Sequence, residues 1–254
     1  MKDYKALAET IYKRKSVREF SKAIAEILEN NVDLMKALDI HPLIDSIKVK
    51  VKVLKKGEVK NDRSDYCIAF YSEEKPLNLE NIGFIGQQID LELQSKGLGT
   101  CWWGMKKPNR NFKSSDGLVC IITMTAGFPR NTETRSYPDG FNRKSIGDIV
   151  VGTLPESRDS APFRLIEAVR IAPSAVNLQP WLIKQTDNKF DFYLKPPKAF
   201  MEKMIKGLRR IDMGIAMAHF FVQAKTVGLD VSFGFEGEDI GQGKFIASVV
   251  TRAG

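Results

Sequence analysis

The sequence predicts an α+β fold built from two related halves, each of which combines helices with strands. Strand-like segments alternate with amphipathic helical segments, and a glycine-spaced segment of the first half recurs in the second. The chain has 254 residues, of which 43% are hydrophobic and 28% charged. This composition is typical of a globular protein, and the length permits one large domain or two small ones.

Helices are predicted where apolar residues recur every three or four positions. In the first half these segments are residues 2–13, 22–38 and 79–96. In the second half they are residues 160–171 and 211–227. Segment 79–96 is followed by a glycine, which is expected directly after the C-terminus of a helix.

Strands are predicted from two other patterns. Residues 47–54, IKVKVKVL, alternate strictly between apolar and charged, which is typical of a half-buried strand. Residues 118–126 form a nearly continuous apolar run, which indicates a buried strand. Residues 127–145 are polar and rich in Gly, Pro and Arg, so a long loop is expected there. Further strands are predicted at residues 66–71, 181–186, 189–195 and 244–253.

Two pairs of glycines indicate an internal duplication. The spacing from Gly83 to Gly97 is identical to the spacing from Gly214 to Gly228. Each pair spans one of the two long predicted helices, so the two helices are expected to be equivalent. Alignment of the pairs sets Gly83 opposite Gly214, and this fixed offset defines the equivalent positions of the two halves.

A second anchor falls at the same offset. Residues 40–42 (Ile-His-Pro) align with residues 171–173 (Ile-Ala-Pro). We therefore expect a first half at residues 1–150 and a second half at residues 151–254. Two such halves can pack like the subunits of a homodimer joined in one chain.

Composition narrows the class of function. The formal net charge is +8, which favours anionic ligands without indicating nucleic-acid binding. Cys67, Cys101 and Cys120 are too few and too scattered for a disulfide scaffold, and no zinc-binding spacing occurs, so no metal is expected. Neither a signal peptide nor an apolar run of membrane-spanning length is present, so we expect a cytoplasmic protein.

Three segments carry side chains suited to ligand binding. KRKSVREF (13–20) offers two guanidinium groups and a hydroxyl, which suit a phosphate, although such clusters are usually solvated faces. RIAPSAVNLQPW (170–181) is a proline-framed polar loop that could bind a ligand or satisfy its own backbone. KGLGTCWWG (96–104) combines backbone freedom with flat aromatic rings, and is alternatively a helix cap followed by core aromatics.

Together the three segments resemble the nitroreductase family of flavin enzymes. RKSVREF, APSAVNLQPW and GLGTCWWG correspond to RRSxRxF-like, APSxxNxQPW-like and GLG-containing segments of the family, and PSAVNLQPW is the specific match. The resemblance implies a nitroreductase-like α+β fold, in which antiparallel or mixed central sheets are flanked by helices. It also implies FMN as cofactor and NAD(P)H as co-substrate.

The order of the segments departs from the family pattern. Residues 41–50 read HPLIDSIKVK where a family subunit carries its APSxxNxQPW segment, and the second half has no clear equivalent of RKSVR. In the family, FMN lies at the dimer interface and both subunits hold it. The resemblance therefore implies a monomer that mimics a homodimer, with one composite FMN site and a second, degenerate site that stays empty.

The resemblance assigns roles to first-half residues. Arg14 and Ser16 would hold the FMN phosphate. Arg18 would lie near the ribityl chain and the pyrimidine end of the flavin, where a cation stabilises the negative charge of the reduced ring. Trp102, Trp103 and Gly104 would pass along the ring, with a backbone N–H near its N5 atom.

The second half and the connecting loop would complete the site. Pro173, Ser174 and Asn177 would cover the flavin, with Gln179 as a weaker candidate. A further cation for the phosphate is expected from Arg143, with Lys144 and Arg135 as alternatives.

Three other residues have simpler interpretations. Asp212 opens the second long predicted helix and matches a family position that can reach the flavin, but we expect it to cap its helix. His219 lies within an apolar helix and is expected to be a satisfied core histidine. Cys101 has no neighbouring base in the sequence, so no catalytic role is assigned to it.

The resemblance implies an FMN-dependent oxidoreductase with a ping-pong cycle. NAD(P)H would reduce the flavin, and a small acceptor such as a nitroaromatic or a quinone would then be reduced, with the chemistry at flavin N5 and no catalytic side chain. No nucleic-acid or membrane partner is expected. The alternatives are a non-enzymatic flavin-binding protein and a degenerate scaffold that binds no flavin.

Overall fold

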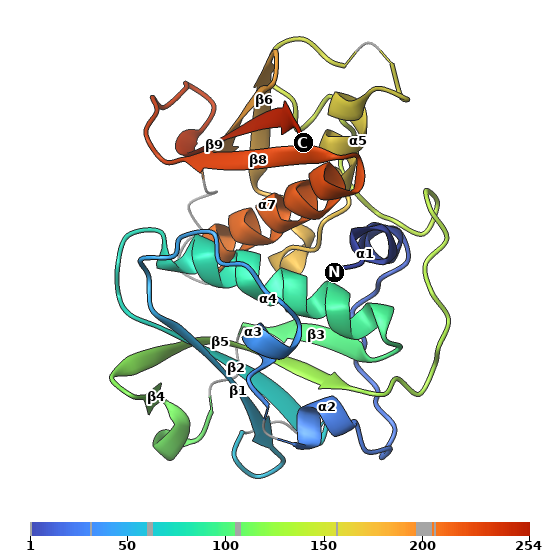
Figure 1. Cartoon of the computed structure of the whole chain (residues 1–254), viewed down its shortest axis with the longest axis vertical. Coiled ribbons are helices and arrows are strands. Elements are labelled where there is room, and N and C mark those ends of the chain that lie inside the picture. Colours follow the sequence, from blue (N-terminus) through green and yellow to red (C-terminus); the bar gives the residue numbers. More distant parts are fainter. Residues whose placement is uncertain are drawn as a thin grey trace.

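Two antiparallel sheets enclose a pair of long helices (Figure 1). The structure is a computed structural model that describes residues 2–30, 32–59, 63–104, 108–155, 157–196, 205 and 207–254. Helix α4 (Asn78–Ser95) and helix α7 (Leu208–Thr226) lie against each other, and one sheet packs on each side of this pair. The result is a layered α+β fold, as the sequence predicts.

The two sheets have the same strand order. The first is β1 (Val49–Lys55), β2 (Tyr66–Ser72), β5 (Leu118–Gly127) and β3 (Gly99–Trp103), with β4 (Ser114–Ser115) beside β5. The second is β6 (Trp181–Thr186), β7 (Lys189–Leu194), β9 (Lys244–Ala253) and β8 (Leu229–Gly234). Apart from the short β4, each sheet thus places its strands in the order first, second, fourth and third along its half.

An irregularity in the two sheets also matches. The register between β2 and β5 shifts between Phe70 and Tyr71, and the register between β7 and β9 shifts between Phe192 and Tyr193. A β-bulge at a Phe-Tyr pair in the second strand of both halves is a shared feature of structure and sequence. This agreement supports the internal duplication.

The helix pair crosses at two glycines that are equivalent in the two halves. A Cβ atom on Gly83 would lie 2.0 Å from the carbonyl oxygen of Ile211, and a Cβ on Gly214 would lie 1.9 Å from that of Glu80. Glu80 and Ile211 are themselves equivalent positions, at the same offset as the two glycines. The contact is therefore reciprocal, as at the two-fold axis of a homodimer.

The shorter helices differ in part from the sequence prediction. The helix predicted at residues 22–38 is wrong as a continuous element, because the structure has two four-residue helices, α2 (Glu26–Glu29) and α3 (Leu34–Ala37). Asp33 accepts hydrogen bonds from the backbone N–H groups of Met35 and Lys36, which starts a new helix there. Leu28, Leu34 and Leu38 still reach the core.

The other helices among the described residues are α1 (Tyr4–Ile11), α5 (Ala161–Arg170) and two 3-10 turns, η1 (Arg110–Phe112) and η2 (Ala175–Asn177). Strands β3, β4 and β8 were not predicted from the sequence. None of the helices in the described part of the chain combines the length and apolar character that a membrane span needs.

The predicted long loop connects the two halves along one side of the molecule (Figure 1). Residues 128–145 contain no helix or strand, apart from an isolated bridge between Pro129 and Phe20. The N–H of Arg135 donates to the carbonyl oxygen of Lys13 at 3.0 Å. The loop thereby lies beside the basic segment that follows α1. The division of the halves at residue 150 stays a prediction.

We expect Gly83→Ala to destabilise the protein strongly. The new methyl group would overlap a backbone carbonyl of α7, so the two helices must move apart. We expect this to lower the free energy of unfolding by at least about 1–3 kcal/mol. Urea unfolding followed by circular dichroism measures this. Gly234→Ala is the control, because no atom lies within 4 Å of its Cβ position. Equal stability of the two variants would refute the close helix crossing.

Candidate functional site

A cavity of about 160 Å³ lies where the two halves meet. Ser16, Arg18, Trp102 and Gly104 come from the first half. The second half supplies residues from the loop before β6 and from the start of α7, namely Pro173, Ser174, Ala175, Val176, Leu208, Ile211, Asp212 and Ile215, and Cys101 and Ile122 complete the wall. Six of the residues assigned to the site from sequence therefore line one cavity.

The basic segment is held along the edge of the first sheet. Ser16 forms a parallel bridge with Thr100, and the N–H of Val17 donates to the carbonyl oxygen of Thr100 at 2.8 Å. In extended backbone, alternate side chains face opposite sides. Ser16 and Arg18 therefore face the cavity, while Val17 packs away from it.

The second-half loop uses its polar side chains to fix its own shape. Ser174 Oγ accepts a hydrogen bond from the N–H of Gln179 at 2.9 Å. Asn177 Oδ1 accepts from Arg143 Nη1 at 2.8 Å, and its amide group donates to the carbonyl of Asn142. Asn177 does not line the cavity, so it positions Arg143 from outside the cavity wall.

Backbone strain accompanies this loop. Val176 has a φ of 44° and Asn177 a φ of 57°. A β-branched residue seldom adopts such angles, and residues of this kind gather at binding sites. Val176 is 68% exposed and lines the cavity. The strained turn thus holds an apolar side chain at the cavity mouth.

Several arginines gather beside the cavity and repel one another. Burial lowers the pKa of Arg143 to about 10, and the charges of Arg135, Arg14 and Arg170 contribute to this lowering. Burial also lowers the pKa of Arg135, as do the charges of Arg14 and Arg18. Arginines that depress one another's pKa favour a bound anion.

The three alternatives for the additional cation make different contacts, and Arg143 Nε itself donates to the carbonyls of Ile171 and Ala172 at 3.3 and 3.1 Å. Arg143 and Arg135 belong to the arginine group described above. Lys144 Nζ donates to the carbonyls of Leu178 and Gln179 at 2.8 and 3.0 Å, so it holds the loop before β6 in place. The residues Arg-Lys-Ser-Ile at 143–146 also repeat Arg-Lys-Ser-Val at 14–17, a short match that the sequence analysis missed.

Arg14 is buried in a polar network and does not line this cavity. Its Nε lies 2.8 Å from Asp90 Oδ2, and its Nη2 has no hydrogen-bond partner among the described residues. Asp90 also accepts hydrogen bonds from Gln87 and Gln94, at 2.7 and 2.6 Å, and from Thr100. An acidic residue within the apolar helix 79–96 is the sequence signal that could have revealed this network.

The network extends to the second half through His219. Its Nδ1 lies 2.9 Å from the carbonyl oxygen of Ala168, so Nδ1 carries the proton, and Nε2 accepts from Gln87 at 3.1 Å. Burial lowers the pKa of His219 to about 3. The expected satisfied core histidine is confirmed.

The two tryptophans lie in different surroundings. Trp102 stacks on Phe70 with ring centroids 5.5 Å apart, and its Nε1 donates to Gln87 at 3.1 Å. It therefore belongs to the core as well as to the cavity wall. Trp103 does not line the cavity, and the Arg63 guanidinium lies 4.5 Å from its ring centroid.

Asp212 does not cap its helix as expected, because α7 begins one turn earlier, at Leu208. Its Oδ1 instead accepts a hydrogen bond from the N–H of Ala175 at 3.0 Å, which fixes the strained loop. Its Oδ2 has no partner among the described residues. Burial raises the pKa of Asp212 to about 8, against weaker opposing effects of the Ala175 N–H and Arg209.

Apolar side chains stand at the equivalent positions on the other side of the helix crossing. Phe84 and Phe233, the equivalents of Ile215 and Trp102, pack edge to face with centroids 5.6 Å apart. Leu43, at the position of Ser174, is buried. These three residues replace side chains that line the cavity.

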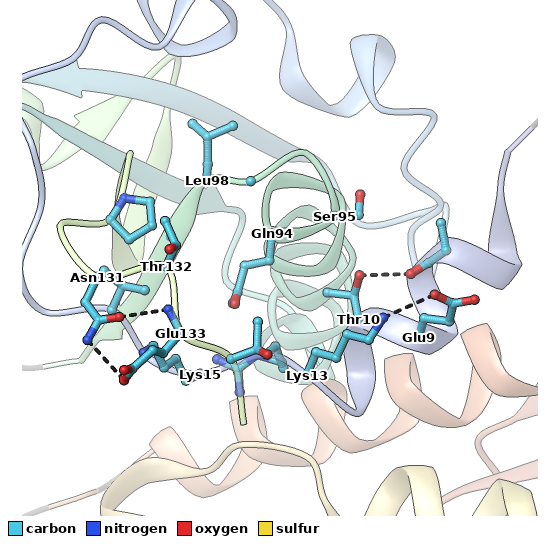
Figure 2. A pocket seen from close by; sticks show the side chains of 17 residues that line it. Glu9, Thr10, Lys13, Lys15, Gln94, Ser95, Leu98, Asn131, Thr132 and Glu133 are labelled. Atoms are coloured by element: carbon cyan, nitrogen blue, oxygen red, sulfur yellow. Dashed lines mark hydrogen bonds and ion pairs between the residues drawn. The ribbon is translucent and has the colours of Figure 1, made fainter. Parts of the chain in front are cut away.

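A second and larger cavity, of about 330 Å³, lies on the other side of the basic segment (Figure 2). Several of its polar side chains pair with one another. Lys13 contacts Glu9 at 3.3 Å, and Asn131 donates to Glu133 at 3.2 Å. Arg14 is part of its wall. Because the paired charges offset one another, we place the candidate site at the smaller cavity.

The geometry thus defines an α+β protein whose two sheets share one strand order, with a composite cavity between the halves. The family model described as "Putative TM nitroreductase" matches residues 6–224. The chain belongs to this nitroreductase family. A comparison with curated proteins finds no match.

One solved structure matches nearly the whole chain. A protein from Thermotoga maritima described as a putative nitroreductase is 22% identical, with a TM-score of 0.65, and the match covers 96% of this chain and 93% of that one. This likeness shows the nitroreductase-like fold.

Two other structures align with part of this chain. A nitroreductase with bound FMN from Desulfitobacterium hafniense is 13% identical, with a TM-score of 0.44, over 61% of this chain and all of that one. An FMN-dependent nitroreductase from Clostridium difficile is 17% identical, with a TM-score of 0.40, over 51% and 91% of the two chains.

We expect Asp212→Asn to become more stable relative to the wild type as the pH rises from 4 to 8. The pKa of a carboxyl in the unfolded chain is about 3.9, and the folded value is about 8. Between these values only the folded state holds the proton, so wild-type stability falls by up to about 1.4 kcal/mol per pH unit, and levels off above pH 8. Urea unfolding of both flavin-free proteins measures the difference. A difference independent of pH would exclude a protonated Asp212.

Proposed function

We propose that this chain is an FMN-dependent oxidoreductase that uses NAD(P)H to reduce nitroaromatics, quinones or similar small acceptors at one composite site. The observation that carries the proposal is the cavity between the halves, because Ser16 and Arg18 meet Pro173 and Ser174 there beside the arginine group. Membership of the nitroreductase family supports it.

The charge pattern fits a phosphate-bearing cofactor. Arg135 and Arg143 lie close enough to Arg14 for their pKa values to fall, and a dianionic phosphate would relieve this repulsion. Arg14 Nη2 is a buried donor without a partner among the described residues, so it can still donate to such a group. Arg14 would act together with Asp90, which holds its guanidinium in place.

The cavity must widen to admit a flavin. Its volume of about 160 Å³ is below the range of about 300–1,000 Å³ that is typical of cofactor and ligand pockets. Val176, at its exposed mouth, and Leu208, at the first turn of α7, are the apolar side chains whose movement would open it. Both come from the second half, so opening leaves the basic segment in place.

Bound FMN would supply two-electron chemistry between NAD(P)H and the acceptor. The residues of the chain would bind and orient it. Arg18 would place a cation beside the ring and favour the negative charge of the reduced state. Ser174 and Pro173 would cover the ring from the second half. Because both halves already meet through α4 and α7, we propose that a single chain completes the site without a second copy.

Flavin stoichiometry tests this proposal directly. After incubation with excess FMN and removal of unbound flavin, we expect about one FMN per chain and bleaching of the visible flavin spectrum by NADH or NADPH. Two FMN per chain would mean that the equivalent place, where Phe84 packs against Phe233, also binds FMN. Bound FMN without turnover would indicate a flavin-binding protein, and no FMN would leave the scaffold alternative.

We expect Arg135→Ala to weaken FMN binding by about 10- to 150-fold. A charged hydrogen bond contributes about 1.5–3 kcal/mol, and the charge of Arg135 lies close to those of Arg14 and Arg18. Fluorescence titration of the flavin measures the dissociation constant. Arg252→Ala removes an exposed arginine from β9 and serves as the charge-matched control. Equal affinities for FMN would place the phosphate elsewhere.

A further inference from the structure

Asp212 is the buried carboxyl in the wall of the composite cavity. It is 3% exposed, and one of its two oxygens is held by the N–H of Ala175. The other, Oδ2, has no hydrogen-bond partner in the described part of the chain. A buried carboxylate oxygen without a donor is strongly disfavoured, whereas a protonated oxygen can donate to a ligand in the cavity.

The charged groups around Asp212 do not supply the missing donor. On its own helix, Arg209 opposes the effect of burial, and its Nη2 donates to the carbonyl of Lys195. Arg210 forms a two-point ion pair with Glu80 of α4, at 2.7 Å for both contacts. From the first half, Arg18 and Cys101 line the same cavity. Asp212 is therefore an acid that faces the cavity in which a ligand would bind.

The equivalent residue of the other half shows what a purely structural side chain looks like here. Asn81 is the equivalent of Asp212, and its Oδ1 accepts from the N–H of Ile44, which is the counterpart of Ala175. It also accepts from Leu43, and its amide group donates to the carbonyl of Ile44. Both the oxygen and the nitrogen of this amide are used. The same scaffold therefore accepts an amide at this position, and the equivalent position in the cavity wall carries an acid.

We propose that Asp212 is the proton donor of the cavity, which holds a proton on Oδ2 and passes it to the acceptor during reduction. This inference rests on the proposed function. With a quinone as acceptor, bound FMN would supply the two electrons and one proton that derive from the hydride of NAD(P)H. The O–H bond of Asp212 breaks and a new O–H bond forms on the quinone oxygen. Solvent then returns a proton to the carboxylate, and the products are a hydroquinone and NAD(P)⁺.

The pH profile of acceptor reduction tests the role. Protein loaded with FMN and reduced by one equivalent of NADPH is mixed rapidly with 1,4-benzoquinone between pH 5.5 and 10. We expect the wild-type rate constant to be level at low pH and to fall about tenfold per unit above pH 8, because only the protonated acid donates. In Asp212→Asn we expect a rate about 100-fold lower at pH 6, without this decline, since general acids contribute about 10²–10⁴-fold.

Two further measurements separate this role from a structural one. Asp212→Asn should retain wild-type FMN content, because an amide oxygen can keep the Ala175 contact. Infrared spectra of the flavin-free protein should show a protonated carboxyl at pH 6 that is lost above pH 9 and is missing in Asp212→Asn. Asp45→Asn, which changes an exposed carboxyl in the equivalent loop of the first half, should match the wild type in every assay.

The outcomes are distinct. An Asp212→Asn protein that reduces benzoquinone at the wild-type rate with the wild-type pH profile overturns the proposal. So does a flavin-free wild type whose infrared spectrum at pH 6 is the same as that of Asp212→Asn. If the wild type binds no FMN, the proposed function fails, and the infrared comparison alone still decides whether Asp212 holds a proton.

Discussion

The reciprocal contact of Gly83 and Gly214 is the constraint on which the rest of the structure depends. Each glycine brings the backbone of one long helix against a carbonyl of the other, so neither position has space for a side chain. This contact sets the distance between the two sheets. It also brings the start of α7 to the end of β3, which is where the composite cavity forms.

Equivalent backbones carry different side chains on the two sides of this crossing. On one side Phe84 packs on Phe233, and Asn81 is fully hydrogen-bonded. On the other side the smaller Ile215 replaces Phe84, a cavity remains, and Asp212 keeps an oxygen without a partner among the described residues. Strained and unsatisfied groups thus gather on the side of the cavity, and such groups are features of functional sites.

Electrostatics links the cavity to the polar interior. Arg14 is held by Asp90, and this pair connects through Gln87 to His219 of the second half and to Trp102 in the cavity wall. Two opposite charges that are buried together hold each other in place. Separating them would leave an unpaired buried charge and destabilise the folded protein. The network therefore orients Arg14, one of the arginines whose charges lower the pKa of Arg135 and Arg143, from inside the protein.

The sequence by itself determined the long helices, most strands, the repeated glycine spacing and the segments that meet at the cavity, because periodicity and short motifs are local properties. It did not determine that residues 22–38 divide into two short helices, since Asp33 there competes for the backbone N–H groups. Only the tertiary structure decided that Trp103 lies outside the cavity wall and that Asn177 accepts a hydrogen bond from Arg143. It also decided that Asp212 Oδ2 has no partner in the described part of the chain, because burial and hydrogen bonding depend on residues distant in the sequence.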